Sequence, residues 1–148
     1  MNAQQVTIRT MQEEDLPTIC ALAAAEDMEL SGDFARTFVA VDEGGIAGFC
    51  RIRLFDGTYY VNPVVTAPRV RGSGLGRILM DEAIRRHGEV SFVARGYAVP
   101  FYRHIGCEEI PWEAIAPEIA ADCDECEMAA TCGALPMRYA AQPESAAE

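Results

Sequence analysis

The segment from Val64 to Arg77 has the residue types and the spacing of an anion-binding turn. It reads Val-Val-Thr-Ala-Pro-Arg-Val-Arg-Gly-Ser-Gly-Leu-Gly-Arg, with glycine at every second position near its end. An apolar strand pattern precedes it and a helical pattern follows. Glycine lets a ligand approach the backbone closely, and the first N–H groups of a helix have no intrahelical partner. Together with the helix dipole and with Arg71 and Arg77, these groups predict a site for a pyrophosphate.

Two other phosphate-binding motifs are excluded by the spacing and the composition. The dinucleotide motif requires Gly-x-Gly-x-x-Gly, whereas this segment is Gly-x-Gly-x-Gly. A P-loop requires Lys before Ser or Thr, and all 12 basic residues of this chain are arginines. The alternative is a glycine-rich loop that turns the chain and binds nothing.

The charge distribution favours a small anionic ligand over a nucleic acid. The net charge is −11, from 23 acidic and 12 basic residues. Residues 69–103 differ from the rest, because they hold seven arginines and three acidic residues. An acidic protein repels a polyanion, whereas a local basic region suits a compact ligand with several phosphates. No run approaches the roughly 20 apolar residues that span a bilayer, so we expect no membrane partner.

Three cysteines near the C-terminus form a second candidate site. Their spacing is Cys123-x-x-Cys126-x5-Cys132, within an acidic stretch. Such a cluster predicts Zn²⁺ or an iron–sulfur centre, with Cys107 or His104 as a fourth ligand. A redox dithiol formed by the Cys-x-x-Cys pair and free thiols in a reducing compartment are the two alternatives.

The periodicity predicts one mixed α/β domain over residues 1–140, followed by a flexible tail over residues 141–148. An antiparallel meander occupies the first half, and a strand–helix–strand crossover follows it. Thr10 and Glu13 predict a capping box before a helix. The expected strands are 5–9, 38–42, 46–55, 59–66, 90–94 and 135–140, and the expected helices are 74–86, 99–105 and 111–122, with a shorter helix or turn at 33–37. The first helix has a buried stripe of Leu16, Ile19, Cys20 and Ala23, and Cys50 is expected inside a strand.

At two places the sequence resembles the GCN5-related N-acetyltransferases (GNAT). The family motif Arg/Gln-x-x-Gly-x-Gly/Ala is matched by Arg71-Gly-Ser-Gly-Leu-Gly76. A second family segment, Ala-x-x-Phe/Leu-Tyr followed by Gly-Phe, is matched from Ala98 to Gly106, with Cys107 in place of the usual Phe. The resemblance covers roughly residues 6–110 in element order. Residues 93–112 also look, more loosely, like amino-acid or acetylglutamate-synthase-like members.

The resemblance implies a mixed, mostly antiparallel sheet flanked by helices, and acetyl-CoA as co-substrate. Tyr102 would be the catalytic proton donor to the departing thiolate. A backbone N–H near Val64 or Val65 would polarise the thioester carbonyl. The cofactor-binding residues would be Val64, Val65, Thr66, Arg71, Gly72, Ser73, Gly74, Leu75, Gly76, Arg77, Ala98 and Phe101.

The acceptor side is less defined by the sequence. In the family, the region of Glu26, Glu29 and Asp33 often lines the acceptor pocket, and any of these carboxylates could act as the base. One of the adjacent Tyr59 and Tyr60 is expected to face that pocket and the other to face the core.

We therefore predict a cytoplasmic enzyme that transfers an acetyl group from acetyl-CoA to a primary amine of a small molecule or amino acid. Its N-terminus is polar and lacks the apolar centre of a secretory signal. A homodimer is compatible with the sequence. The alternatives are a non-catalytic acyl-CoA-binding or metal- or redox-responsive module on the same fold, and a protein or peptide N-acetyltransferase.

Overall fold

The computed structural model describes residues 6–124 and 133–141. The chain divides into two compact units, and each is described by itself. The first comprises Met1–Arg53 and Pro63–Glu82, and the second comprises Leu54–Asn62 and Ala83–Glu148. The expected tail over residues 141–148 lies almost wholly outside the described residues. The prediction of a single domain over residues 1–140 stays a prediction.

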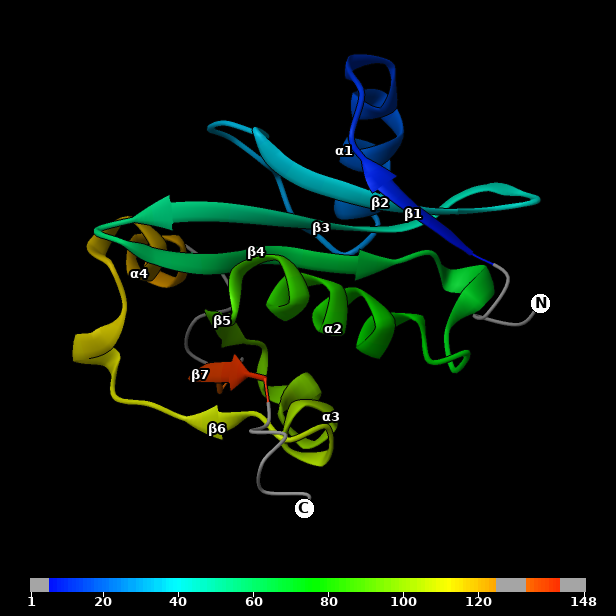
Figure 1. The fold of residues 1–148 in the computed structure, drawn as a ribbon. Coiled ribbons are helices and arrows are strands. Elements are labelled where there is room, and N and C mark those ends of the chain that lie inside the picture. The colour runs from blue at the N-terminus through cyan, green and yellow to red at the C-terminus, as the bar shows by residue number, and fades with distance from the viewer. Residues whose placement is uncertain (1–5, 125–132, 142–148) are drawn as a thin grey trace. The chain divides into compact units, whose positions relative to one another are not determined.

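The described part of the chain contains seven strands in one sheet, in the order β1-β2-β3-β4-β5-β7-β6 (Figure 1). The pairs β1–β2, β2–β3, β5–β7 and β6–β7 are antiparallel, and β4–β5 is parallel. The predicted mixed α/β class with a crossover is confirmed. The strands are β1 (Thr7–Thr10), β2 (Arg36–Asp42), β3 (Gly45–Phe55), β4 (Thr58–Thr66), β5 (Glu89–Ala94), β6 (Glu108–Glu109) and β7 (Leu135–Ala140), and the helices are α1 (Leu16–Ala24), α2 (Leu75–His87), α3 (Val99–His104) and α4 (Pro117–Asp124), with short 3-10 turns η2 (Glu13–Asp15), η3 (Pro68–Val70), η4 (Gly96–Ala98) and η5 (Trp112–Ala114).

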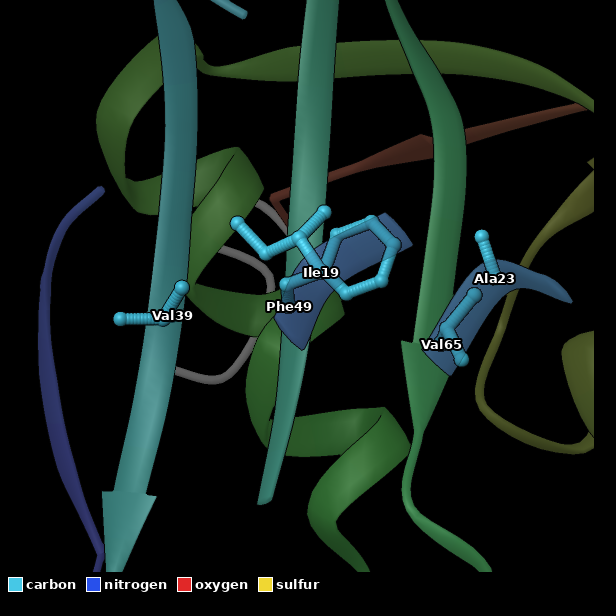
Figure 2. Close-up of a cluster of buried hydrophobic side chains, with 5 residues drawn as sticks. All are labelled: Ile19, Ala23, Val39, Phe49 and Val65. Carbon is cyan, nitrogen blue, oxygen red and sulfur yellow. The ribbon is translucent and has the colours of Figure 1, made fainter. Parts of the chain in front are cut away.

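The core of the first unit lies between α1 and the face of β2 and β3 that carries Val39 and Phe49 (Figure 2). Ile19 and Ala23 of α1 are fully buried there, as their helical spacing predicts. Cys20, expected on the same stripe, is exposed. That prediction was wrong because the stripe is narrower than four positions. Ile19 and Ala23, four residues apart, are the buried residues of α1.

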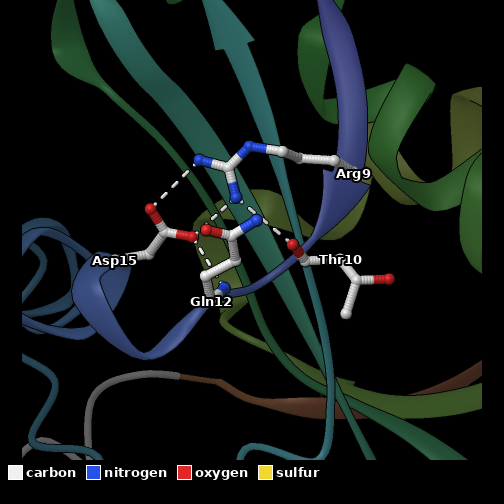
Figure 3. A network of polar contacts seen from close by, with 4 residues as sticks. All are labelled: Arg9, Thr10, Gln12 and Asp15. Atoms are coloured by element: carbon white, nitrogen blue, oxygen red, sulfur yellow. Dashed lines mark hydrogen bonds and ion pairs between the residues drawn. The ribbon is translucent and has the colours of Figure 1, made fainter.

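A capping box of Gln12 and Asp15 opens the 3-10 turn η2, which leads into α1, in place of the predicted box of Thr10 and Glu13 (Figure 3). The Asp15 carboxylate accepts hydrogen bonds from the backbone N–H of Gln12 at 2.8 Å and from both terminal nitrogens of Arg9 at 2.7 and 3.1 Å. The side-chain hydrogen bonds from Arg9 lower the pKa of Asp15 below its ordinary value. The capping position moved because the 3-10 turn η2 precedes the α-helix.

The strands of the first half follow the predicted hairpin pattern. The Asp56-Gly57 turn between β3 and β4 has positive φ at both residues, 51° and 78°, which is the geometry that Asp-Gly favours. Residues 33–35 form a turn, in which Asp33 Oδ1 accepts from Ala35 N–H at 3.2 Å. The helical alternative for 33–37 was wrong, because β2 already begins at Arg36.

In the second unit, β7 pairs with β5 along six residues, as the predicted strand at 135–140 requires. The strand β6 lies between the helices expected at 99–105 and 111–122, where the predicted element order includes an optional strand. Its pairing places Glu108 opposite Arg138, with which it forms an ion pair. The expected helix over 111–122 is instead η5 and α4 separated by extended backbone at Ile115. Pro117 also keeps the two apart, since proline disfavours the helical conformation in the residue before it, which is Ala116.

Tyr60 is the central side chain of the second unit. It is almost fully buried, in contact with Ile115, Ala116 and Ile119. Its hydroxyl accepts a hydrogen bond from Ala116 N–H at 2.9 Å. Tyr60 is therefore the core member of the tyrosine pair, as one of the two was expected to be.

None of the helices that the structure describes has the length and the apolar character needed to cross a membrane.

Candidate functional site

The glycine-rich turn lies in the first unit, between the end of β4 at Thr66 and the first residue of α2, Leu75. Gly72 and Gly74 have φ of 82° and 91°, in the left-handed region that favours glycine. A Cβ built on either residue would meet nothing within 4 Å. These glycines are therefore required by the backbone path and not by close packing, and the space above the turn is open.

The beginning of α2 presents amide groups that have no intrahelical partner. The backbone N–H of Ile78 donates to the carbonyl of Gly74 at 3.2 Å, which makes Gly74 the residue that opens the helix. The N–H groups of residues 74–77 precede this first intrahelical bond. The Ser73 hydroxyl lies 3.4 Å from Leu75 N, at the limit of a hydrogen bond. The turn thus combines free donors, the positive end of a 13-residue helix and open space, which suits a phosphate group.

Gly48 allows this part of α2 to lie close to the sheet. A Cβ at Gly48 would lie 2.8 Å from the Val65 carbonyl oxygen, and 3.2 and 3.3 Å from methyl groups of Leu79 and Leu75. The backbone oxygen cannot move out of the way without disturbing β4. The absence of a side chain at Gly48 therefore allows the N-terminus of α2 to lie this close to β3.

Arg69 holds the beginning of the turn to the β2–β3 hairpin. It donates to both carboxylate oxygens of Asp42, each at 2.8 Å, and the Asp42 side chain has no exposed surface. Asp42 also accepts from Gly44 N–H at 2.8 Å. The side-chain hydrogen bonds from Arg69 hold the pKa of Asp42 below its ordinary value. Arg69 is therefore a structural residue of the turn.

The other two arginines of the turn also have carboxylate partners. Arg71 forms an ion pair with Glu26, and Arg77 lies 3.7 Å from Asp81, one helical turn further on. Both pairs are more exposed than that of Arg69. The local excess of arginine is thus largely balanced within the unit. An anion would be held mainly by amide groups, and by those arginines that can change partners.

A second cluster in the first unit holds the segment that follows α1. Arg51 on β3 is 98% buried, donates to the Ser31 carbonyl at 2.7 Å, and lies 4.8 Å from the centre of the Phe34 ring. Arg53, two residues along the same strand face, lies against Gly32. Arg51 binds the backbone of this segment, so it is not exposed to a ligand.

The predicted residues Val64, Val65 and Thr66 form the end of β4. The Val65 side chain is in the core cluster of α1, so only its backbone groups are available to a ligand. The predicted acceptor-side carboxylates differ in their surroundings. Glu29 and Asp33 are exposed, whereas Glu26 is partly buried by its ion pair.

The remaining predicted residues belong to the second unit. Ala98 ends η4, and Phe101 and Tyr102 lie in α3. The Tyr102 ring lies against Phe92, with centroids 4.6 Å apart, and Phe101 is 40% exposed. Tyr102 is therefore held by ring packing while remaining partly accessible. His104, one of the two suggested fourth ligands of the cysteine site, is exposed.

The predicted cysteine site lies largely outside the described residues. Cys126 and Cys132 lie outside the described residues, and Cys123 is in the last turn of α4, where side chains are not described. Among the described residues, no group of three or more His, Cys, Asp and Glu side chains could hold a metal ion. Cys107, a suggested fourth ligand, is buried, and so is Cys50.

Three partners of the turn were missed by the sequence reasoning: Asp42, Glu26 and Gly48. Each is distant in the chain from the residue it serves. The Asp before a hairpin turn was visible, but nothing in its spacing indicated Arg69. Only the fold brings these positions together.

The family profile described as an acetyltransferase (GNAT) domain matches residues 33–109, just over half of the chain. The chain belongs to this family, and its fold is the acetyl-CoA-binding fold of GNAT acetyltransferases.

The solved structures that resemble this chain share the fold at low identity. N-acetylglutamate synthase from Neisseria gonorrhoeae, in complex with coenzyme A and N-acetyl-glutamate, has a TM-score of 0.74 at 12% identity, covering 93% of this chain and 35% of that chain. The ribosomal-protein-S18-alanine N-acetyltransferase from Escherichia coli has a TM-score of 0.66 at 18% identity, over 94% and 97% of the two chains. Nourseothricin acetyltransferase has a TM-score of 0.66 at 24% identity, over 93% and 99%. This chain therefore spans about a third of the length of the N-acetylglutamate synthase chain. Among proteins with curated descriptions, none matches the sequence significantly.

Proposed function

We propose that this protein transfers an acetyl group from acetyl-CoA to a primary amine of a small molecule or amino acid. The observation that carries the proposal is the turn from Arg71 to Arg77, with positive φ at Gly72 and Gly74 and open space above both. The amides of residues 74–77 would hold the diphosphate of the cofactor. Membership of the GNAT family identifies acetyl-CoA as the ligand with which such a turn is associated.

The proposed reaction is a direct attack without a covalent enzyme intermediate. The amine nitrogen forms a bond to the thioester carbonyl carbon, the C–S bond breaks, and the nitrogen loses its proton to a base, for which Glu26, Glu29 and Asp33 are the candidates. The backbone N–H of Val64 or Val65 would stabilise the negative charge that develops on the carbonyl oxygen. Tyr102 would supply a proton to the departing thiolate. Ala98 and Phe101 would contact the cofactor.

Incubation with acetyl-CoA and a panel of amines tests this function. Free CoA and acetylated amine should appear together, and both are best measured by chromatography because the six cysteines of the protein would add to a thiol signal. Tight binding of acetyl-CoA without turnover on any amine would favour a non-catalytic module. Turnover on peptides with no small amine accepted would favour a protein N-acetyltransferase.

We also propose a cytoplasmic location, the formation of a homodimer, and a metal bound by Cys123, Cys126 and Cys132. Elemental analysis of protein purified without chelator addresses the last of these. Zinc or iron at about one equivalent per chain, lost on substitution of Cys126 by Ser, is the expected result. Absence of both metals with three titratable thiols would contradict it.

A further inference from the structure

Glu26 and Arg71 form an ion pair between the end of α1 and the glycine-rich turn. Both residues lie in the first unit. The Arg71 side chain is 53% exposed and that of Glu26 is 20% exposed, so the guanidinium is the more accessible partner. Arg71 is also the first residue of the motif proposed to hold the cofactor diphosphate. Arg71 is thus paired with the Glu26 carboxylate and is also expected to contact the diphosphate of the cofactor.

The position of Glu26 is set by the way in which α1 ends. The backbone N–H of Met28 donates to the Ala23 carbonyl at 3.0 Å, and that of Asp27 donates to the Ala24 carbonyl at 3.0 Å. Asp27 has a φ of 60°. This is the Schellman motif, here with Asp in the left-handed position that glycine usually occupies. Met28 packs against the core cluster that contains Ala23. The backbone of Glu26 is therefore held firmly, and any change of partner falls to the side chains.

The three arginines of the turn differ in how readily they could change partners. Arg69 donates two hydrogen bonds to a fully buried carboxylate, which would be left unpaired in the protein interior if Arg69 moved. Arg77 is paired loosely with an exposed Asp81. Arg71 is intermediate in how readily it could change partners, since the carboxylate of Glu26 is mostly buried but still partly exposed to solvent. A diphosphate bound to Arg71 would also bring its negative charge close to the Glu26 carboxylate, and the two like charges would repel each other.

We propose that Glu26 and the diphosphate of the cofactor compete for Arg71, so that cofactor binding breaks the Glu26–Arg71 ion pair and releases the Glu26 carboxylate. This inference rests on the proposed function, because it takes the turn as the diphosphate site. It assigns to Glu26 a role in setting the affinity for the cofactor.

Binding of CoA to the wild type, to Glu26→Gln and to Glu14→Gln, followed by calorimetry, tests the competition. Glu14 is an exposed acid in η2 of the same unit, so its variant controls for the loss of one negative charge. Glu26→Gln should bind CoA about two- to fivefold more tightly, which is the range for an exposed ion pair, and Glu14→Gln should bind as the wild type does. Unchanged or weaker binding by a folded Glu26→Gln would overturn the proposal.

A double-mutant cycle separates competition from simple repulsion. In the Arg71→Ala background, the added substitution Glu26→Gln should improve CoA binding by less than it does in the wild type, because there is no cation to release. An equal improvement with and without Arg71 would mean that Glu26 repels the cofactor without competing for the arginine, and would overturn the proposal.

A measurement on the wild type does not depend on any variant folding. Carbodiimide labelling of carboxylates, read by mass spectrometry, should modify Glu26 more in the presence of CoA than in its absence. Pantetheine, which lacks the diphosphate, should leave the labelling unchanged. Equal labelling of Glu26 with and without bound CoA would refute the exchange of partners at Arg71, and it would leave the proposed function untouched. A wild type that binds no CoA at all would refute the proposed function, and the inference with it.

Discussion

Asp42 and Arg69 join the β2–β3 hairpin to the beginning of the glycine-rich turn by two parallel hydrogen bonds of 2.8 Å. The carboxylate is fully covered and accepts a third hydrogen bond from Gly44 N–H. A charged acceptor with this many donors is satisfied only while Arg69 keeps its place. The relationship therefore anchors the start of the turn to the sheet.

Substitution of Asp42 by Asn should weaken both the fold and cofactor binding. The amide presents an N–H group to a guanidinium that has no acceptor capacity, so the two-pronged bond is lost. We expect the melting temperature to fall by a few degrees, and CoA to bind more weakly because the turn is less well held. The control is Glu43→Gln, which removes one negative charge from the exposed neighbour. Wild-type values for Asp42→Asn in both measurements would show that the pair does not position the turn.

The acid sensitivity of the fold should follow from Asp42 and Asp15. Hydrogen bonds from Arg69 and Arg9 lower both native pKa values below the ordinary value of 3.8. The unfolded chain therefore binds protons at a higher pH than the folded chain does. The stabilising contribution is complete well above pH 3.8, and it is lost as the pH falls through 3.8 toward the lower native values.

Urea unfolding at several pH values between 7 and 3 measures this dependence. The free energy of unfolding should decrease on the acid side, and the decrease should be shallower in Asp42→Asn than in the wild type. An acid-side slope that is the same in both proteins would assign the sensitivity to other carboxylates.

The elements that sequence reasoning located correctly are those with strong local signals. The antiparallel meander with its Asp56-Gly57 turn and the strand-to-helix change after Thr66 depend on neighbours in the chain, and both are present. The capping residue of α1, the burial of Cys20 and the single helix over 111–122 were wrong. In each of these, a neighbouring 3-10 turn or the packing geometry decided the outcome.

The partners of the candidate site were not predictable for a different physical reason. Glu26 and Arg71 are 45 residues apart, and Asp42 and Arg69 are 27 apart. Ion pairs of this kind leave no periodic pattern, because each residue alone looks like a solvated charge. The glycine motif could be recognised from its spacing, whereas the neutralisation of its arginines could not.

Substitution of Gly48 by Ala should destabilise the first unit. The added methyl would lie 2.8 Å from the Val65 carbonyl oxygen, so the strand or the helix must shift. We expect a loss of about 1–3 kcal/mol in the free energy of unfolding, as for other overpacked sites. A Gly48→Ala protein with the wild-type free energy of unfolding, measured by urea unfolding, would contradict the close approach.

Alanine at Gly72 or Gly74 separates backbone strain from ligand binding. Both glycines have positive φ in open space, as does Gly57 in the β3–β4 turn. All three variants should therefore lose a similar stability, about 1–2 kcal/mol from the left-handed conformation. Only the variants at Gly72 and Gly74 should bind CoA more weakly, because their methyl groups enter the space above the turn. Equal CoA affinity in all three proteins would exclude that space as the diphosphate site.

Substitution of Tyr102 by Phe tests the proposed proton donor. The ring should keep its packing on Phe92, because only the hydroxyl is removed, so stability and CoA binding should stay at wild-type values. If the hydroxyl protonates the departing thiolate, kcat should fall by about 10²–10⁴, the range for a general acid, and the loss should be smaller with a thioester whose thiol is more acidic. Tyr97→Phe is the control, since Tyr97 is 66% exposed and has no assigned role. A Tyr102→Phe enzyme with wild-type kcat would show that the thiolate leaves without this proton, and that Tyr102 serves only as part of the aromatic packing of α3.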